Sequence, residues 1–187
     1  MICFYDKDID SICAAAILKL QFYDAKLIKA KEFFDIDYLN RIMKHHIKIY
    51  IINHEFETGL FSQLKTAYDV TWIYKGKVKY RRNPERSDPL LGSSSEIMWK
   101  LMFPESKTPV FIKYLSEYSI LRLTKKEKNN FKNNIDPFYR GLHIFNLYPE
   151  EREFWINMFK NKHNEVNQII SAGKIINSYE KNKNNYV

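Results

Sequence analysis

Three aspartates follow the first apolar segment of the chain at alternate positions. Residues 1–5, which end in ICFY, predict a buried strand, and Asp6, Asp8 and Asp10 come directly after it. Ligands of open α/β sheets bind at the carboxyl ends of the strands. Carboxylate oxygens are the donors that Mg²⁺ and Mn²⁺ prefer. The spacing therefore makes this acidic turn a candidate site for one divalent cation.

Other interpretations of the acidic turn fit less well. An EF-hand loop needs Gly where Ser11 stands and Glu where Ile17 stands. A haloacid dehalogenase pattern matches Asp6 and Asp8 but expects Thr at the position of Asp10. A solvated acidic turn without a ligand stays an open alternative.

A second group of candidate residues is basic. In residues 75–82, a basic residue occupies every second position, at Lys75, Lys77, Lys79 and Arg81, and Arg82 follows directly. On an extended segment the alternating residues share one face, opposite Val78 and Tyr80. Such a face could bind a phosphate without a metal, and Tyr74 or Tyr80 could stack a base beside it. The alternative is a solvated basic edge that blocks strand pairing.

The elements that position these groups follow from the apolar pattern. We expect strands near residues 1–5, 25–30, 48–52 and 70–73, and intervening helices at 11–22, 37–44 and 59–67. This alternation predicts an α/β domain whose mainly parallel sheet is flanked by helices. Residues 81–94 contain two prolines and a glycine and predict a loop.

The second half of the chain predicts helices at 96–102, 108–121, 150–162 and 166–179. We therefore expect a single domain over residues 1–179, with a sheet-rich part at 1–80 and a mainly helical part at 95–179. Residues 180–187 are expected to form a frayed tail.

Composition and charge limit the class of protein. The 187 residues carry a formal net charge of +8, which favours anionic partners such as nucleotides or nucleic acid. Two cysteines cannot form a disulfide framework, and the early aspartates do not fit a signal peptide. No apolar run is long enough to cross a bilayer. We expect a cytoplasmic protein without a membrane partner.

Residues 5–16 (YDKDIDSICAAA) resemble the first motif of the DHH phosphoesterase superfamily. Later segments are similar to further motifs of this family, in the same order. Residues 49–54 resemble the second motif, 69–76 the strand that carries Asp-His-His, and 114–119 the fourth motif. Residues 93–99 are similar to a Ser-Gly-Ala-Glu-x-x-Trp segment of the oligoribonuclease-like branch, and 169–176 resemble the helix that leads out of the first domain. The resemblance implies a DHH-like fold and a two-metal phosphodiesterase ancestor.

Several metal-binding positions of the family carry other residues here. Asp8 and Asp10 are retained. The other positions differ: Asp6 stands in place of the first-motif His, and Asn53 in place of the second-motif Asp. Tyr74-Lys75-Gly76 stands in place of Asp-His-His, and Ser119 in place of the fourth-motif Asp. Two-metal cleavage needs two ions about 3.5–4 Å apart. The pair His45-His46 lies before a strand and out of register, so it does not replace the missing ligands. The resemblance therefore implies a degenerate relative.

The resemblance also gives an expectation about substrate binding. Family members have a smaller C-terminal domain, and we expect this chain to lack it because Val187 stands where the linker would begin. The favoured hypothesis is a protein that binds a nucleotide, an oligonucleotide or a host protein, as an inhibitor of the kind encoded by phages. Its expected ligand-binding residues are Asn53, His54, Tyr74, Lys75, Lys77, Lys79, Arg81 and Arg82, and it needs no cofactor.

Two alternatives remain. Asp6, Asp8 and Asp10 could hold Mn²⁺ or Mg²⁺ in an active phosphodiesterase. The surface left without a second domain could also bind a protein partner or a second copy, because its expected lining is aromatic. That lining comprises Phe33, Phe34, Phe56, Phe61 and Tyr118. In the competing outcome, helices from residues 125–179 fill the gap.

Overall fold

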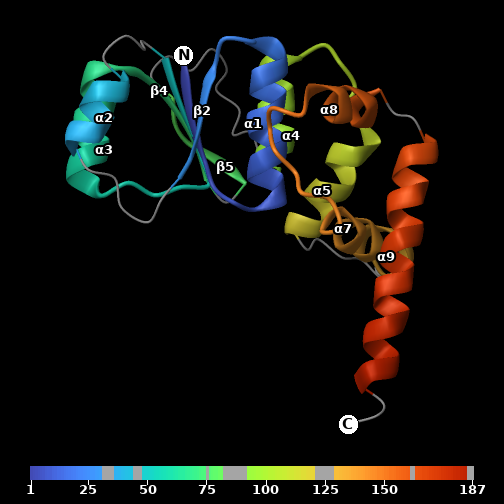
Figure 1. The fold of residues 1–187 in the computed structure, drawn as a ribbon. Helices are drawn as coiled ribbons and strands as arrows, with labels where there is room; N and C mark the ends of the chain where they lie inside the picture. Colours follow the sequence, from blue (N-terminus) through green and yellow to red (C-terminus); the bar gives the residue numbers. More distant parts are fainter. Residues whose placement is uncertain are drawn as a thin grey trace.

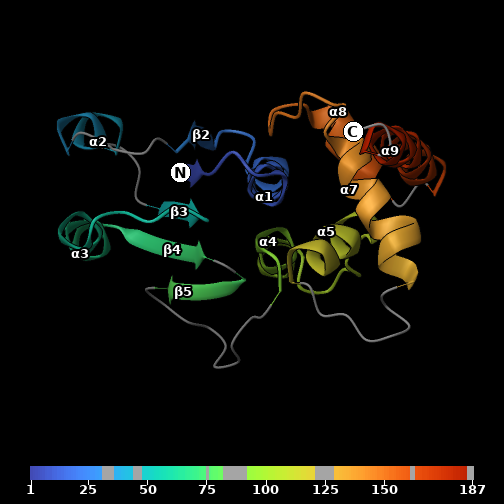
Figure 2. The same ribbon diagram turned by 90° about the horizontal axis from the view of Figure 1, so that it is seen from below.

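A mainly parallel sheet forms the centre of the computed structural model, which describes residues 1–30, 36–43, 48–74, 76–81, 92–120, 129–160 and 163–184. The sheet has five strands in the order β2-β1-β3-β4-β5 (Figures 1 and 2). Its parallel members are β1 (Ile2–Tyr5), β2 (Lys26–Lys29), β3 (Lys48–Ile52) and β4 (Asp69–Tyr74), and β5 (Lys77–Arg81) runs antiparallel to β4. The α/β class and the mainly parallel sheet are confirmed.

The central strands are apolar because helices cover both of their faces. Every residue of β1 is buried, as are the last four of β3. Strands buried on both sides read as continuous apolar runs rather than as alternating patterns. The pairing of β1 with β3 and of β3 with β4 confirms the expected neighbours at residues 1–5, 48–52 and 70–73.

The helices nearest the sheet form one layer on each face. Helices α1 (Ile9–Gln21) and α4 (Ser94–Met102) cover one face, and α2 (Ile36–Met43) and α3 (Thr58–Ala67) cover the other (Figure 2). Alternate residues of β1 belong to different buried clusters, with Cys3 on the α1 side and Phe4 on the α3 side. The sheet therefore separates two apolar cores.

The remaining helices pack beyond α1 and α4, away from the sheet (Figure 1). They are α5 (Val110–Ile120), a π-helical turn (Phe131–Ile135) that leads into α7 (Asp136–Leu142), α8 (Arg152–Phe159) and α9 (His163–Asn184). The ring of Phe111 in α5 lies 5.1 Å from that of Phe138 and 5.8 Å from that of Trp155. One buried cluster consequently extends from β1 to α9. Helix α9 continues to Asn184, beyond the expected end at residue 179.

The aromatic residues expected to line one open surface lie in separate places. Phe56 and Phe61 pack against the core on the α3 side. Tyr118 instead stacks on Tyr139 of α7, with ring centroids 3.7 Å apart and ring planes 8° apart. Phe33 and Phe34 lie outside the described residues. None of the described helices is both long and apolar enough to span a membrane.

Helices α7 and α9 approach each other closely through two glycines. A Cβ atom added to Gly173 would lie 1.7 Å from the carbonyl oxygen of Pro137. A Cβ added to Gly141 would lie 2.1 Å from the carbonyl oxygen of Ile169. Both obstacles are backbone atoms, which cannot move aside without shifting a helix. The missing side chains therefore set the distance between α7 and α9.

We predict that Gly173→Ala destabilises the protein by about 2 kcal/mol or more, because overpacking of a close helix crossing forces the backbones apart. Gly59→Ala is the matched control, since a Cβ at this position in α3 meets no atom within 4 Å. The control is expected to be neutral or stabilising by up to about 1 kcal/mol. Urea denaturation measures both, and equal stabilities would contradict the close crossing.

Candidate functional site

A buried carboxylate joins α1 to the first turn of α4. Asp10, the second residue of α1, is 7% exposed. Its Oδ2 accepts a hydrogen bond from the Ser94 amide at 2.7 Å, and its Oδ1 accepts from the Ser95 amide at 3.0 Å and the Ser95 hydroxyl at 2.5 Å. Burial raises the pKa of Asp10, and the bonds from Ser95 and Ser94 oppose that rise. The amides at a helix start have no partner within their own helix, so this carboxylate acts as a cap from outside α4.

A second chain of hydrogen bonds links α1, β3 and α4. Asp8 caps α1 by accepting the Ser11 amide at 2.9 Å, and its other oxygen accepts the Ser11 hydroxyl at 2.5 Å. The amide nitrogen of Asn53 donates to the Ser11 hydroxyl at 2.9 Å. The Ser94 hydroxyl donates to the Asn53 side-chain oxygen at 2.8 Å. Asn53 directly follows β3, with φ of 52°, a left-handed conformation that Asn tolerates better than most residues.

The start of α4 is completed by residues from α5. The Ser93 hydroxyl accepts the Glu96 amide at 3.2 Å, which gives α4 its own cap. The Ser93 amide donates to the hydroxyl of Ser116 in α5 at 3.3 Å, and that hydroxyl donates to the Glu96 carboxylate. Ser119, at the position that corresponds to a family aspartate, is exposed and takes no part in these bonds. We call the hydrogen-bonded set Asp8, Asp10, Ser11, Asn53, Ser94 and Ser95 the serine–carboxylate network.

The three aspartates expected to share one cation do not come together in one site. Asp8 and Asp10 belong to the serine–carboxylate network, whereas Asp6 accepts the Lys7 amide at 2.6 Å. His54 packs edge-on against Phe56, with ring centroids 4.9 Å apart, and burial lowers its pKa. Within the described ranges, no three His, Cys, Asp or Glu side chains are grouped as a metal site would require. The retained carboxylates are thus engaged in hydrogen bonds, Asp8 with Ser11 and Asp10 with the start of α4.

The expected basic face is interrupted by a bulge. Lys77 pairs with Tyr74 at the carboxyl end of β4, whereas Arg81 pairs with Thr71, farther from that edge. The register shifts between the Ile73–Val78 and Trp72–Tyr80 pairs, which leaves Lys79 as the extra residue. Lys77, Lys79 and Arg81 therefore do not follow the regular alternation that we expected. Lys75 and Arg82 lie outside the described residues, as do His45 and His46.

Tyr74 lies near Trp72, on the α3 side of the sheet. Its ring lies 6.0 Å from that of Trp72, which packs on the α3 side of the sheet. The Trp72 indole nitrogen donates to the His54 carbonyl at 3.0 Å. Tyr74 and His54 therefore contribute to the carboxyl edge from its α3 side, while Asn53 joins the network.

A row of exposed lysines lies along the same edge of the sheet. Lys29 ends β2 opposite Tyr5, Lys7 follows β1, and Lys77 starts β5 opposite Tyr74. Within the described part of the chain, Lys7 and Lys29 have no ion-pair partner. Sequence reasoning identified Lys77 alone, because Lys7 and Lys29 belong to no pattern of basic residues. Their position follows only from strand register.

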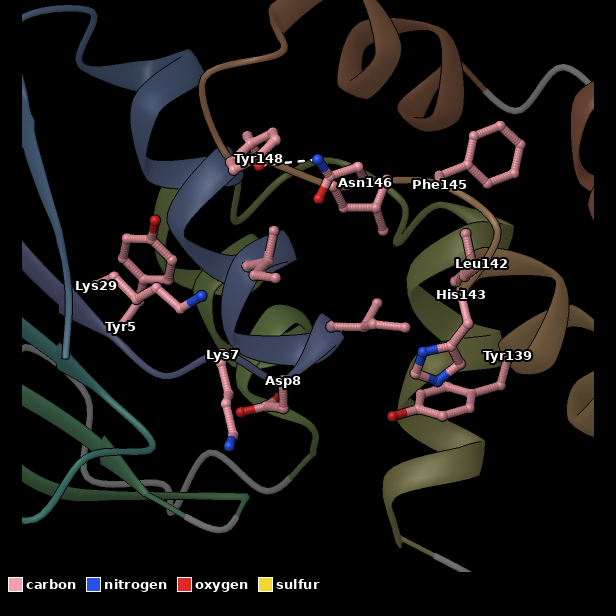
Figure 3. Close-up of a pocket in the computed structure, with 13 residues that line it drawn as sticks. Tyr5, Lys7, Asp8, Lys29, Tyr139, Leu142, His143, Phe145, Asn146 and Tyr148 are labelled. Atoms are coloured by element: carbon pink, nitrogen blue, oxygen red, sulfur yellow. Dashed lines mark hydrogen bonds between the residues drawn. The ribbon is translucent and has the colours of Figure 1, made fainter. Parts of the chain in front are cut away.

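A cavity of about 300 Å³ opens beside this edge, between β1, the start of α1, and α7 (Figure 3). Tyr5 and Lys29 line one side, and Tyr139 and His143 line the other. Figure 3 shows the Lys29 ammonium group directed into the cavity and the Tyr139 hydroxyl directed toward Asp8. Burial raises the pKa of Tyr139, and the charges of Asp8 and Asp10 add to the rise.

The hydroxyl of Tyr5 faces this cavity without a hydrogen-bond partner among the described residues. The side chain is 7% exposed, and burial, with smaller contributions from Glu150, Cys3 and Tyr148, raises its pKa to about 12. The phenol is therefore a hydrogen-bond donor throughout the neutral pH range.

Comparisons with protein-family models, with curated proteins and with solved structures find no match to this chain. The geometry of the carboxyl edge is consequently the main basis for a functional assignment.

We predict that Asn53→Asp destabilises the protein by about 1–3 kcal/mol at neutral pH. An ionised carboxylate cannot donate to Ser11, and it would add a charge beside Asp8 and Asp10. Those charges would raise the pKa of the new carboxyl above its unfolded value of about 3.9, so the loss should shrink as the pH falls toward 4. Thermal melts from pH 4 to 8 measure this dependence.

Asn40→Asp is the isosteric control for that variant, because Asn40 is an exposed residue of α2. The change there should alter stability by less than about 0.5 kcal/mol. Equal effects of the two substitutions would show that Asn53 does not hold the network together.

Proposed function

We propose that this protein is a degenerate relative of the DHH phosphoesterases that binds a phosphate-bearing ligand without hydrolysing it. Its binding surface is the carboxyl edge of the sheet, where ligands of open α/β sheets generally bind. The proposal extends the sequence resemblance to a function, and it rests on what the side chains at this edge do.

The observation that carries the proposal is the role of Asn53 in the serine–carboxylate network. Its side chain donates to Ser11 and accepts from Ser94. The resemblance implies an aspartate at this position. An aspartate could still accept the Ser94 hydroxyl, but it could not donate to the Ser11 hydroxyl. The amide is therefore suited to joining serines and poorly suited to bridging two cations.

The retained aspartates support the same conclusion. Both oxygens of Asp10 accept bonds from the start of α4, and both oxygens of Asp8 accept bonds from Ser11. A cation would have to compete with these donors for the same oxygens. In this chain the carboxylates hold helices in place, and that role does not require a metal.

The charge around the network favours an anionic ligand. Lys7, Lys29 and Lys77 come from three different strand ends along the edge, and the chain as a whole has a formal charge of +8. A lysine ammonium group binds phosphate as a point charge without needing a fixed geometry. The cavity beside Lys29 is a partly open hollow of about 300 Å³, a size that suits a small ligand better than a protein partner.

We predict that the protein with Mn²⁺ or Mg²⁺ leaves short oligonucleotides and cyclic nucleotides intact, because the carboxylates are committed to hydrogen bonds. Chromatography of the incubated nucleotides measures the products, and the rate should not exceed that of buffer with metal. Metal-dependent hydrolysis that Asp8→Asn abolishes would contradict the proposal and favour the phosphodiesterase alternative. Asp24→Asn is the control, since Asp24 is exposed and distant in sequence from the network.

A further inference from the structure

The cavity beside β1 combines groups of different chemistry that lack partners within the described chain. Tyr5 brings a hydroxyl donor to the cavity wall, and Lys29 is an exposed cation with no ion pair among the described residues. Both come from neighbouring strand ends, because Tyr5 and Lys29 are partners in the β1–β2 register. A donor and a cation placed together make a position for a phosphate group.

The opposite side of the cavity is aromatic. Tyr139 is held by its stack on Tyr118, whose ring in turn stacks on that of Phe131 at 5.7 Å. His143 packs edge-on against Tyr139, with ring centroids 5.0 Å apart. The ring is therefore fixed before any ligand arrives, so little side-chain freedom is lost on binding. Rings of this kind bind the face or edge of a nucleobase.

Asp8 lies between these two sides. Its oxygens accept two bonds from Ser11, and a carboxylate offers about four acceptor positions. The remaining positions need donors. In dinucleotide-binding α/β sheets an acidic residue accepts the 2′-hydroxyl of ribose, and Asp8 could accept ribose hydroxyls in the same way. An isolated inorganic phosphate would supply charge for Lys29 but neither the paired ribose hydroxyls for Asp8 nor a base for Tyr139.

We propose that this cavity binds a single nucleoside 5′-monophosphate, with its phosphate at Lys29 and Tyr5, its ribose hydroxyls at Asp8 and its base beside Tyr139. This assignment rests on the proposed function and specifies its ligand class. The volume of about 300 Å³ is at the lower end of ligand pockets, which run from about 300 to 1,000 Å³, and it suits one nucleotide rather than a strand.

Isothermal titration calorimetry with the four 5′-ribonucleoside monophosphates, the corresponding 2′-deoxynucleotides, and inorganic phosphate tests the assignment. We expect at least one ribonucleotide to bind, its 2′-deoxy form to bind more weakly, and inorganic phosphate to bind much more weakly. Lys29→Ala should weaken nucleotide binding about tenfold, and Tyr5→Phe about threefold to tenfold, as expected for one charged and one neutral hydrogen bond.

Lys26→Ala is the matched control, because Lys26 is an exposed lysine at the other end of β2. It removes the same charge from the same strand and should change the dissociation constant less than twofold. A melt without ligand shows that each variant is folded. If Tyr5→Phe proves unstable, Lys29→Ala decides the test, since Lys29 is an exposed residue whose truncation should leave the fold intact.

The outcomes separate this assignment from the proposed function. Nucleotide binding that is equal in wild type and Lys29→Ala would overturn the assignment, as would inorganic phosphate binding as tightly as any nucleotide. Oligonucleotide binding that depends on Lys77, without monophosphate binding, would also overturn it while leaving the proposed function in place. Hydrolysis of a bound nucleotide would overturn the proposed function itself.

Discussion

The position of the α4 N-terminus depends on one buried carboxylate. Removing an ionised group from water costs several kcal/mol unless other groups replace the lost hydration. Around Asp10 the replacement comes from two amides and a hydroxyl at the start of α4, together with the positive end of that helix. Because few other groups could supply these bonds, α4 must begin beside the first turn of α1.

This constraint extends to the whole carboxyl edge. With its amide bound to Asp10, Ser94 donates its hydroxyl to Asn53. Asn53 in turn donates to the Ser11 hydroxyl, which donates to Asp8. The carboxyl ends of β1 and β3 and the first turns of α1 and α4 therefore meet at one place. Most of their polar groups form hydrogen bonds with one another. The groups left unsatisfied lie next to this point, on the side of the cavity. In the proposed assignment, the phosphate therefore binds at Lys29 and Tyr5, beside the network, and only Asp8 of the network contacts the ligand.

Much of the fold could be predicted because it depends on local apolar runs. The strands β1, β3 and β4 are continuous apolar segments, and their adjacency follows from the regular alternation with helices. Asp8 and Asn53 could be placed at one edge because each directly follows a strand. Helix α7 was missed because Pro137 and Gly141 weaken its helical signal, although Gly141 is required by the close approach of α9. The bulge at Lys79 is not visible in a regular alternation of residue types.

The parts of the site that escaped prediction depend on contacts between distant residues. Asp10 and Ser94 are 84 positions apart, and neither residue type indicates the other as a partner. Ser11, Ser95 and Ser116 lie in segments that resemble family motifs, but nothing in those segments identifies them as partners of carboxylates, because such a serine looks like any other serine. Tyr5 and Lys29 become neighbours only through the register of β1 and β2. Register is set by the packing of the entire sheet and is therefore not a local property.

The long separation between Asp10 and Ser94 also has a consequence for the order of folding. A chain made from its amino end produces all five strands of the described sheet before Ser94 appears. Until then Asp10 has no α4 to cap, so it must stay hydrated, and α1 cannot settle fully against its final neighbours. Contacts of such long range slow folding, because the entropy of closing the loop is lost before the contact forms. The same bonds that define the carboxyl edge are therefore expected to form late, as one of the last steps toward the native state.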